Sequence, residues 1–464
     1  MKSCHWLVVG LACSTLSQSI LAQGKLSRMQ MEADLQQLFA VTRRTYAYVD
    51  EKKEQYGVDL DRMEADALKR LDKVQSDADF GVLVKEIIAA LRDGHCEASA
   101  DHLIAPRQRA WPFHLHSVKE GVVVTDMAPS VAGSGIEHGN VLKRVNGRPI
   151  EDWINEAART VSASTDGARR RLALKQMIST ADESVRVKIE HANGTTATFT
   201  VKTGPYLRLP AEPNLADPPE GRFVAAHVLK RGVGYIRFPS FGWETAERHR
   251  AKTDAEMDAA AQPARDQIDA AFAAVAATKA LVLDLRGNRG GWDNLGAYVL
   301  SHLEPGDFRY YATQTRSSPE LRAIDKFPWL PRDDGWAPKV DWIPRKTTFS
   351  FFQGKTYTGA LVVLINEDVG SAADCLAAAL ADLHPNVRFV GRPTHGAAGG
   401  PKDLAKLKHS GVGVRLCTMR VWTPKGRLIE GQGTRPDVPV QWTREDVRKG
   451  RDPDLEAALK DLSR

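Results

Sequence analysis

Residues 360–380 read ALVVLINEDVGSAADCLAAAL, and this stretch decides the fold. The apolar run over 360–365 predicts a buried strand, and the alanine-rich run over 372–383 predicts a helix. The short loop between them ends in Gly370-Ser371. Strands that alternate with helices are typical of α/β domains, so we expect an α/β domain around this segment.

Ser371 stands where the predicted helix begins. Backbone N–H groups are unpaired at a helix N-terminus and the helix dipole favours negative charge there, so the amide of Ala372 suits an oxyanion. Serine is also among the best N-cap residues. From this segment alone, a capping role is favoured over a nucleophilic one.

A second segment, ALVLDLRGNRGG over 280–291, predicts another buried strand that ends in a glycine-rich turn. Glycines let backbone N–H groups approach a ligand closely. The turn lacks the spacing of a Walker phosphate loop and no Gly-Lys-Ser/Thr follows, so we do not expect a nucleotide site. The amide of Gly290 or Gly291 would complete an oxyanion hole with Ala372.

The chain alternates strands and helices on both sides of these segments. We expect an α/β core over 223–445 and a C-terminal helix over 446–464. Besides the elements already named, the core is predicted to contain strands over 233–238 and 387–390 and helices over 255–277 and 295–302.

Four regions precede this core. Lys2, the apolar run over 6–16 and the small residue Ala22 predict a signal peptide over 1–22, and therefore a periplasmic or secreted protein. Helical periodicity predicts a helical domain over 23–108, with a helix that stops at Asp93-Gly94. Strand-like runs and a hairpin around Asn193-Gly194 predict a β-rich domain over 109–203, and a linker follows over 204–222.

Composition and charge exclude several function classes. The 64 basic and 58 acidic residues nearly cancel to a net charge of +6, which gives little reason to expect a nucleic-acid partner. No stretch after the signal peptide is apolar for long enough to anchor the chain in a membrane. Beyond the signal peptide, Cys96, Cys375 and Cys417 stand far apart and predict neither a metal site nor a disulfide scaffold. We expect all three to be packed and reduced, and thiol catalysis by Cys96 or Cys375 is not favoured.

The order of the motifs resembles the C-terminal processing (tail-specific) serine peptidase family. The resemblance rests on residues 284–291, 370–374, 391–396 and 429–438, and the segment over 135–147 is similar to the core motif of PDZ domains. It implies an α/β core of ClpP- or crotonase-like repeats, a PDZ-like domain over 109–203 and Ser371 as the nucleophile. It also implies an oxyanion hole from Ala372 and Gly290 or Gly291, a peptide or protein substrate and no cofactor.

One departure from this family changes the expected base. Members with a Ser-Lys dyad carry lysine where this chain has Ala397, and the nearest lysine is Lys402. The segment Leu91-Arg-Asp-Gly-His95 resembles the tricorn-like branch, which uses Ser, His and Glu. This resemblance implies His95 as the base and Glu430 as the acid that orients or stabilises it, while His395 is the rival base.

Several alternatives stay open. His95 also fits a helix end or a surface position, and Glu430 also fits a solvated turn. The missing lysine leaves room for a catalytically inactive peptide- or ligand-binding protein. An α/β-hydrolase esterase is not favoured, because Val369-Gly370-Ser371-Ala372-Ala373 lacks the second glycine of G-x-S-x-G. The sequence gives no indication of oligomeric state.

Overall fold

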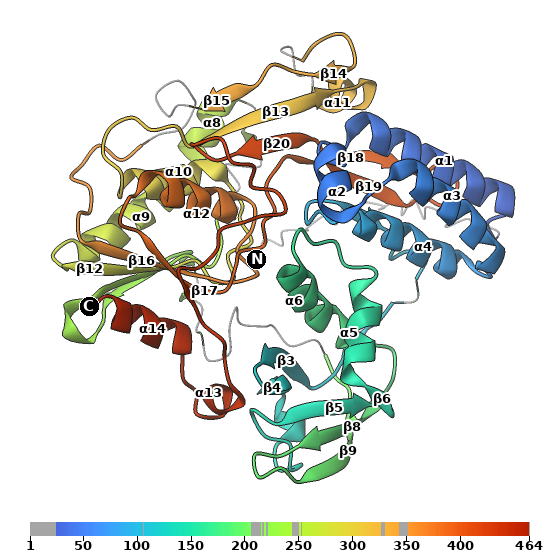
Figure 1. The fold of residues 1–464 in the computed structure, drawn as a ribbon, viewed down its shortest axis with the longest axis horizontal. Coiled ribbons are helices and arrows are strands. Elements are labelled where there is room, and N and C mark those ends of the chain that lie inside the picture. Colours follow the sequence, from blue (N-terminus) through green and yellow to red (C-terminus); the bar gives the residue numbers. More distant parts are fainter. Residues whose placement is uncertain are drawn as a thin grey trace, which may run out of the picture.

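The computed structural model describes residues 25–463 apart from 105, 206–214, 216–217, 220, 244–249, 252, 326–329 and 343–350. The predicted signal peptide over 1–22 and most of the predicted linker over 204–222 lie outside the described residues. Figure 1 shows three parts: the N-terminal helices at upper right, a β-rich domain at lower right and the α/β core at left. No helix among the described residues combines the length and apolar character needed to cross a bilayer.

A six-stranded sheet lies at the centre of the α/β core. Its order is β10-β11-β12-β16-β17-β21, and neighbouring strands are parallel except for the antiparallel pair β10 and β11. Four of its strands were predicted and are confirmed, while β10 and β21 were not foreseen. The strands are β10 (Ala225–Val228), β11 (Gly234–Arg237), β12 (Ala280–Asp284), β16 (Ala360–Ile365), β17 (Arg388–Gly391) and β21 (Val438–Pro439).

Helices cover both faces of this sheet, which explains why its strands are apolar throughout. Leu281 and Leu283 belong to the core cluster that includes α9 (Gln262–Val275), α10 (Asp293–Ser301) and α12 (Ala372–Leu383). Val282, which points to the opposite face, belongs to the cluster that contains Ala458 of α14 (Pro453–Asp461).

Two predicted helices are each divided in the structure. The helix expected over 255–277 consists of α8 (Asp254–Ala260) and α9, with Pro263 in the first turn of α9. The helix expected over 446–464 consists of α13 (Arg444–Arg448) and α14, which begins at Pro453. Proline has no N–H to donate and its ring clashes with the preceding turn, so it begins a helix more readily than it continues one.

The N-terminal helices share their core with distant strands. Leu38, Phe80 and Ile88 pack in one cluster with Leu404 and Leu416. β1 (Glu97–Ser99) also pairs with β19 (Gly413–Cys417), which in turn pairs with β18 (Pro401–Lys406). The helices are α1 (Arg28–Thr45), α2 (Val49–Tyr56), α3 (Leu60–Arg70), η1 (Leu71–Lys73) and α4 (Asp77–Ala90).

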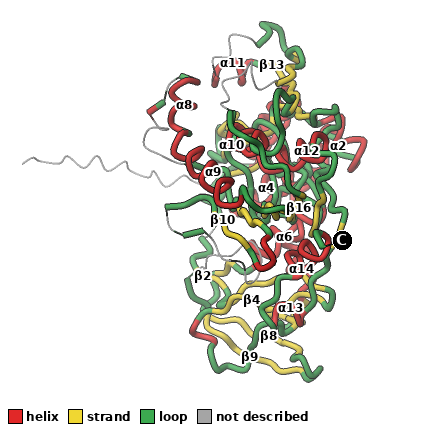
Figure 2. Tube along the Cα trace, turned by 90° about the vertical axis from the view of Figure 1, so that its left-hand side faces the viewer, coloured by secondary structure: helices red, strands yellow, loops and turns green. Residues whose placement is uncertain are grey.

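A small antiparallel sheet adjoins the core at its other edge. In it, β13 pairs with β14, β15 and β20. Its elements are β13 (Tyr311–Ser317), α11 (Pro319–Asp325), β14 (Gly335–Trp336), β15 (Val340–Trp342) and β20 (Met419–Trp422). Figure 2 shows β13 with α11 at one end of the molecule and β8 and β9 at the other.

The region over 109–203 is β-rich, as predicted, and has its own apolar core. Its sheet follows the order β3-β4-β5-β8-β9, and the hairpin around Asn193-Gly194 is confirmed. Its elements are β2 (Arg109–Ala110), β3 (Phe113–Val118), β4 (Gly121–Met127), η2 (Pro129–Val131), β5 (Val141–Val145), β6 (Arg148–Pro149), α5 (Ile150–Ala158), α6 (Asp166–Met177), β7 (Ser179–Thr180), β8 (Ser184–Glu190) and β9 (Thr196–Lys202).

Helix α6 of the β-rich domain is tied to the core by a buried ion pair. Arg171 Nε lies 3.0 Å from Asp368 Oδ2, and Lys175 Nζ lies 2.7 Å from Asp368 Oδ1. Burial alone would raise the pKa of Asp368, but the two cations outweigh it and hold that pKa well below its usual range. Asp368 stands three residues before Ser371, so this domain is anchored beside the predicted nucleophile.

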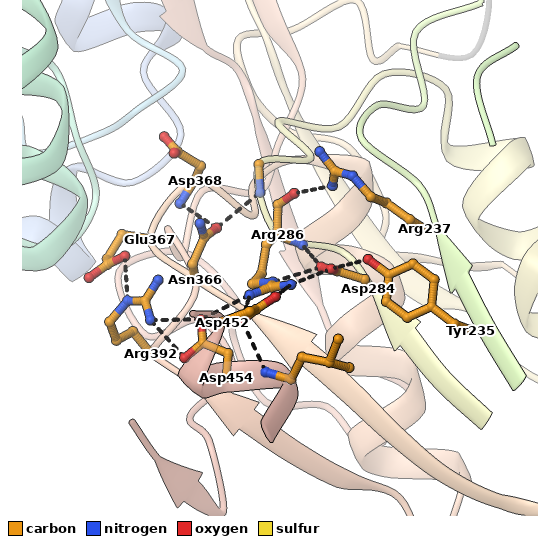
Figure 3. Close-up of polar contacts among 12 residues, drawn as sticks. Tyr235, Arg237, Asp284, Arg286, Asn366, Glu367, Asp368, Arg392, Asp452 and Asp454 are labelled. Atoms are coloured by element: carbon orange, nitrogen blue, oxygen red, sulfur yellow. Dashed lines mark hydrogen bonds and ion pairs between the residues drawn. The ribbon is translucent and has the colours of Figure 1, made fainter. Parts of the chain in front are cut away.

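A second buried network joins the central strands to the C-terminal helix (Figure 3). Arg286 Nη2 lies 2.6 Å from Asp284 Oδ2, and its Nη1 lies 2.7 Å from Asp452 Oδ1 and 3.2 Å from Asp454 Oδ2. Burial disfavours both charges, but the contact prevails: it lowers the pKa of Asp284 and raises that of Arg286. The Tyr235 hydroxyl donates a further hydrogen bond of 2.7 Å to Asp284.

Replacing this arginine tests how much the fold depends on the network. Arg286→Met removes the guanidinium to which the buried carboxylates of Asp284 and Asp454 are both paired, and we expect the free energy of unfolding in urea to fall by about 3–5 kcal/mol. The control is Arg448→Met, which removes an exposed pair with Glu445 and is expected to leave the unfolding midpoint unchanged. Equal midpoints for the two variants would contradict a structural role for Arg286.

Candidate active site

Ser371 joins β16 to α12 in a strained conformation. Its φ of 56° and ψ of −128° lie in a region that residues with a side chain rarely adopt. It occupies the N-cap position of α12, but its side chain makes no capping hydrogen bond. A serine that served only as a cap would have extended φ/ψ and would accept a hydrogen bond from the helix. The capping interpretation is therefore wrong.

The glycine turn over 287–291 lies directly against this serine. A Cβ atom on Gly290 would stand 2.5 Å from Ser371 Cβ and 2.8 Å from the Ala372 nitrogen, so only glycine fits. The turn is fixed because Gly370 N–H donates to the Asn288 carbonyl at 3.0 Å. Gly290 N–H donates to Asn288 Oδ1 at 2.9 Å.

The position expected to hold lysine in a Ser-Lys dyad holds a buried alanine. The Ala397 carbonyl accepts a 2.7 Å hydrogen bond from Ser371 N–H, and the Ala397 N–H donates to Asp374 Oδ2 at 2.9 Å. The next amide, Ala398 N–H, donates to Glu430 Oε2 at 3.2 Å. Ala397 thus connects the predicted nucleophile with two buried acids without supplying a base.

Glu430 is a buried acid rather than a solvated turn residue. Its Oε1 lies 2.7 Å from Lys52 Nζ, and both side chains are almost fully buried. Burial, with help from Asp93, raises the pKa of Glu430 to about 7, while Lys52 opposes the increase. For Lys52, burial would lower the pKa but the contact with Glu430 prevails and raises it. Lys52 is therefore a poor base.

Lys52 is a site residue that the sequence did not reveal. It lies on α2, whose sequence is VDEKKEQY. Val49 and Tyr56 pack against the core of the N-terminal helices, and Lys52 is on their side of the helix, but so short an apolar pattern does not mark a lysine as buried. Only the contact with Glu430, 378 positions away in the chain, identifies it.

His95 lies in the turn that follows α4. Asp93 Oδ1 accepts a 2.8 Å hydrogen bond from the His95 N–H, and Gly94 N–H donates to Ser164 Oγ at 2.9 Å. The His95 ring is partly exposed, and its Nδ1 is buried without a hydrogen-bond partner. Burial lowers the pKa of His95 and Glu430 opposes that decrease, so the neutral imidazole is the form present near pH 7.

His395 packs between the two turns that carry His95 and Ser371. A Cβ on Gly94 would lie 2.5 Å from its Nε2, and a Cβ on Gly370 would lie 3.4 Å from its Cβ. Burial lowers the pKa of His395 to about 3, and its Nε2 has no hydrogen-bond partner. Such a ring accepts a proton with difficulty, which weakens His395 as the rival base.

The burial and the thiol pKa values of the cysteines near the site argue against a nucleophilic role. Cys96, Cys375 and Cys417 are free and buried, as predicted. Burial raises the pKa of each thiol well above its usual range. A reactive cysteine requires a lowered pKa, so thiol catalysis has no support here.

An open pocket of about 830 Å³ lies beside residues 431–435. Its lining comes from α2, from the start of α6 and from the segments around 384–393 and 427–437, and does not include Ser371. We therefore place the chemistry at the turns around Ser371 rather than in this pocket.

Comparisons with known proteins bear on the family and the fold of this chain. Residues 232–440 match peptidase family S41. A stretch of 92 residues is 34% identical to a carboxy-terminal-processing protease of Bartonella bacilliformis and spans 20% of this chain and 20% of that protein. The structure of mature CPAF is similar, with a TM-score of 0.71 and 17% identity over 93% of this chain and 96% of that one. Mature CPAF complexed with lactacystin gives a TM-score of 0.69 and 18% identity over 94% and 98%. At these identities the structural likeness shows a shared fold.

Asp374 allows a test of the electrostatics of this site by pH. Burial raises the pKa of Asp374 to about 8, against hydrogen bonds from Thr394 and Ala397. The folded protein therefore keeps a proton on Asp374 that the unfolded chain releases near pH ~4. The free energy of unfolding of the wild type consequently falls as the pH rises from ~4 to ~8. Relative to it, Asp374→Asn should gain about 1 kcal/mol of unfolding free energy per pH unit between pH ~5 and ~7.

The measurement is urea unfolding of both proteins across this pH range. The control is Asp403→Asn, because Asp403 is exposed and hydrogen bonds from Arg415 lower its pKa. Its difference from wild type should not change over the same range. A flat difference for Asp374→Asn would mean that Asp374 is ionised in the folded protein.

Proposed function

Because residues 232–440 match peptidase family S41, we propose that the chain is an exported serine peptidase that hydrolyses peptide bonds through an acyl-enzyme on Ser371. The observation that carries this proposal is the conformation of Ser371, which is strained and uncapped against Gly290. Strain of this kind persists only where the surrounding structure maintains it, and it concentrates at functional sites. A protein that only bound peptides would have no use for it, so the inactive alternative is not favoured.

In this proposal His95 is the general base. His95 takes the proton of Ser371 Oγ as the oxygen attacks the carbonyl carbon, and then gives that proton to the departing amine. Water repeats the sequence on the acyl-enzyme, with His95 as base, and restores Ser371. A neutral imidazole is needed for the first step, and burial favours that form.

Glu430 has the supporting acid role. Its carboxyl group raises the pKa of His95 against the effect of burial, and so stabilises the imidazolium that forms during attack. Lys52 in turn holds Glu430 in place. This assigns the chain to the Ser/His/Glu branch of the family rather than to the Ser-Lys branch.

The oxyanion of the tetrahedral intermediate would bind at the start of α12. The amide of Ala372 is the first donor, and the turn of Gly290 and Gly291 supplies the second. Gly290 N–H is hydrogen-bonded to Asn288 Oδ1, which favours Gly291 of the two.

The substrate is a peptide or protein, and the β-rich domain is proposed to hold it. Edge strand β3 lies beside α6, the arrangement by which PDZ-like domains add an extended peptide to a sheet. Because Arg171 and Lys175 of α6 bind Asp368, a peptide on this domain would lie close to the Ser371 loop. The protein is proposed to act in the periplasm or outside the cell.

Labelling with a fluorophosphonate tests the nucleophile. We expect folded protein to be labelled at Ser371 and denatured protein not to be labelled. Ser371→Ala should lose the label with an unchanged urea midpoint, whereas Ser240→Ala, which changes a serine beside Gly290, should keep it. A label that survives in Ser371→Ala would disprove this assignment.

Comparison of the two histidines tests the base. His95→Ala should slow peptide hydrolysis by about 10²–10⁴-fold, since it removes the proton acceptor. His395→Ala should retain most of the turnover, because the pKa of His395 is about 3 in the folded protein. If His395→Ala is the more damaging change, the roles of the two histidines are reversed.

A further inference from the structure

Three different metal-ligating groups meet beside the proposed base. One carboxylate oxygen of Asp93, one ring nitrogen of His95 and the sulfur of Cys417 all lie within 4.8 Å of one another. The pairing of β1 with β19 explains this, because Glu97 faces Arg415 and the residues before 97 and after 415 meet at one end of the ladder. Cys417 is far from Asp93 and His95 in the sequence, so cysteine and histidine spacing gives no sign of the cluster.

Two side-chain atoms of these residues are buried without a hydrogen-bond partner in the described part of the chain. They are Oδ2 of Asp93 and Nδ1 of His95. Asp93 is fully buried, so bulk water cannot satisfy its oxygen. Buried polar atoms of native proteins nearly always have a partner, and two without one in the same cluster indicate a ligand that binds them.

The surroundings of the cluster also favour a cation. Asp93 and Glu430 both lie near the ammonium of Lys52, so two acids share one lysine. The Tyr46 hydroxyl and the Cys96 thiol also lie beside Asp93 and bring no further cation to it. A divalent cation adds the positive charge that the two carboxylates lack.

The donor set matches zinc. Zinc binds cysteine sulfur, histidine nitrogen and aspartate oxygen, and sites with three protein ligands leave a fourth position for water. Ligand atoms around tetrahedral zinc stand about 3.4–3.7 Å apart, so the three groups, which lie within 4.8 Å of one another, need to move closer by roughly 1.4 Å at most. Magnesium and calcium prefer sites made of oxygen alone.

We infer that Asp93, His95 and Cys417 form a zinc-binding site that switches the enzyme off. On binding, the Cys417 thiol loses its proton to solvent and a Zn–S bond forms, while His95 and Asp93 each donate a lone pair to the metal. An imidazole held by zinc is no longer available to take the proton of Ser371. The inhibitory part of this inference rests on the proposed role of His95, whereas the binding part does not.

Zinc binding is measured first, by competition with a chromophoric chelator. We expect one zinc ion per wild-type chain, and at least about tenfold weaker binding to Cys417→Ser, which loses one of three ligands. Cys375→Ala is the matched control, because Cys375 is also buried but lies on α12, outside the cluster, and should bind zinc as wild type does. Absence of stoichiometric binding, or equal affinity of Cys417→Ser, would overturn the site.

Two further variants serve as controls for the zinc-binding measurement. His95→Ala should also bind zinc at least about tenfold more weakly, which covers the case of a misfolded Cys417→Ser. Ser371→Ala should bind zinc like wild type, since Ser371 is not a ligand. Normal zinc binding by Ser371→Ala thus separates the metal site from the proposed nucleophile.

Inhibition is measured by fluorophosphonate labelling of Ser371. Saturating zinc should suppress labelling of wild type and of Cys375→Ala, and a chelator should restore it. Cys417→Ser should need at least about tenfold more zinc for the same suppression. Labelling that continues with zinc bound would overturn the inhibitory role. A lack of labelling in zinc-free protein would instead count against the proposed function, while the binding result would remain.

Discussion

The buried guanidinium of Arg286 is the interaction on which the site depends. Arg286 lies two residues after the end of β12, and the next residue begins the glycine turn that contacts Ser371. Asp284, Asp452 and Asp454 bind it, so one charge fixes the turn and the C-terminal helix together (Figure 3). Asp454 also binds Arg392, whose Nε lies 3.2 Å from Glu367 in the loop before Ser371. Buried charges are tolerated only when each has a partner of opposite charge. Movement of the chain on either side of Ser371 would separate these ion pairs and leave a buried charge unpaired, so the network favours one arrangement.

Around Ser371 the opposite condition holds, and polar atoms are left unsatisfied. Asp93 Oδ2, His95 Nδ1, Asp374 Oδ1 and His395 Nε2 are all buried without partners. Native proteins satisfy nearly all such atoms, so their concentration here marks a region whose interactions are completed by something other than the folded chain. Substrate, a transferred proton or a metal ion would each complete part of it. The paired charges around Arg286 and the unpaired polar atoms beside Ser371 are therefore complementary. The ion pairs fix the turns that flank Ser371, and the unpaired atoms stay available to a bound partner.

The sequence predicts the central strands and helices well, because burial on two faces makes β12 and β16 continuous apolar runs and the helices beside them are periodic. It also leads to the expectation that Gly290 or Gly291 lies near Ser371 and Ala372. In the structure these residues follow parallel neighbouring strands whose carboxyl ends share one edge. The sequence does not predict Lys52, which lies on a short helix whose apolar residues are only Val49 and Tyr56. It does not predict the approach of Cys417 to Asp93 either, because that depends on the register of β1 against β19. The protonation of Asp374 follows from burial, which a residue's identity does not specify.

Burial also explains why a histidine suits this site once lysine is absent from position 397. Removing water disfavours every charged form, so it raises the pKa of acids and thiols and lowers that of histidine. Cys96, Cys375 and Cys417 are kept protonated and unreactive by this effect. Lys52 escapes it only because Glu430 binds its ammonium, which fixes the charge and removes the lone pair that a base needs. A histidine is instead kept neutral by the same burial, so its lone pair stays available to accept a proton. The difference between His95 and His395 is then one of degree: the acid near His95 offsets part of the cost of the charged ring, and Arg289 adds to that cost for His395.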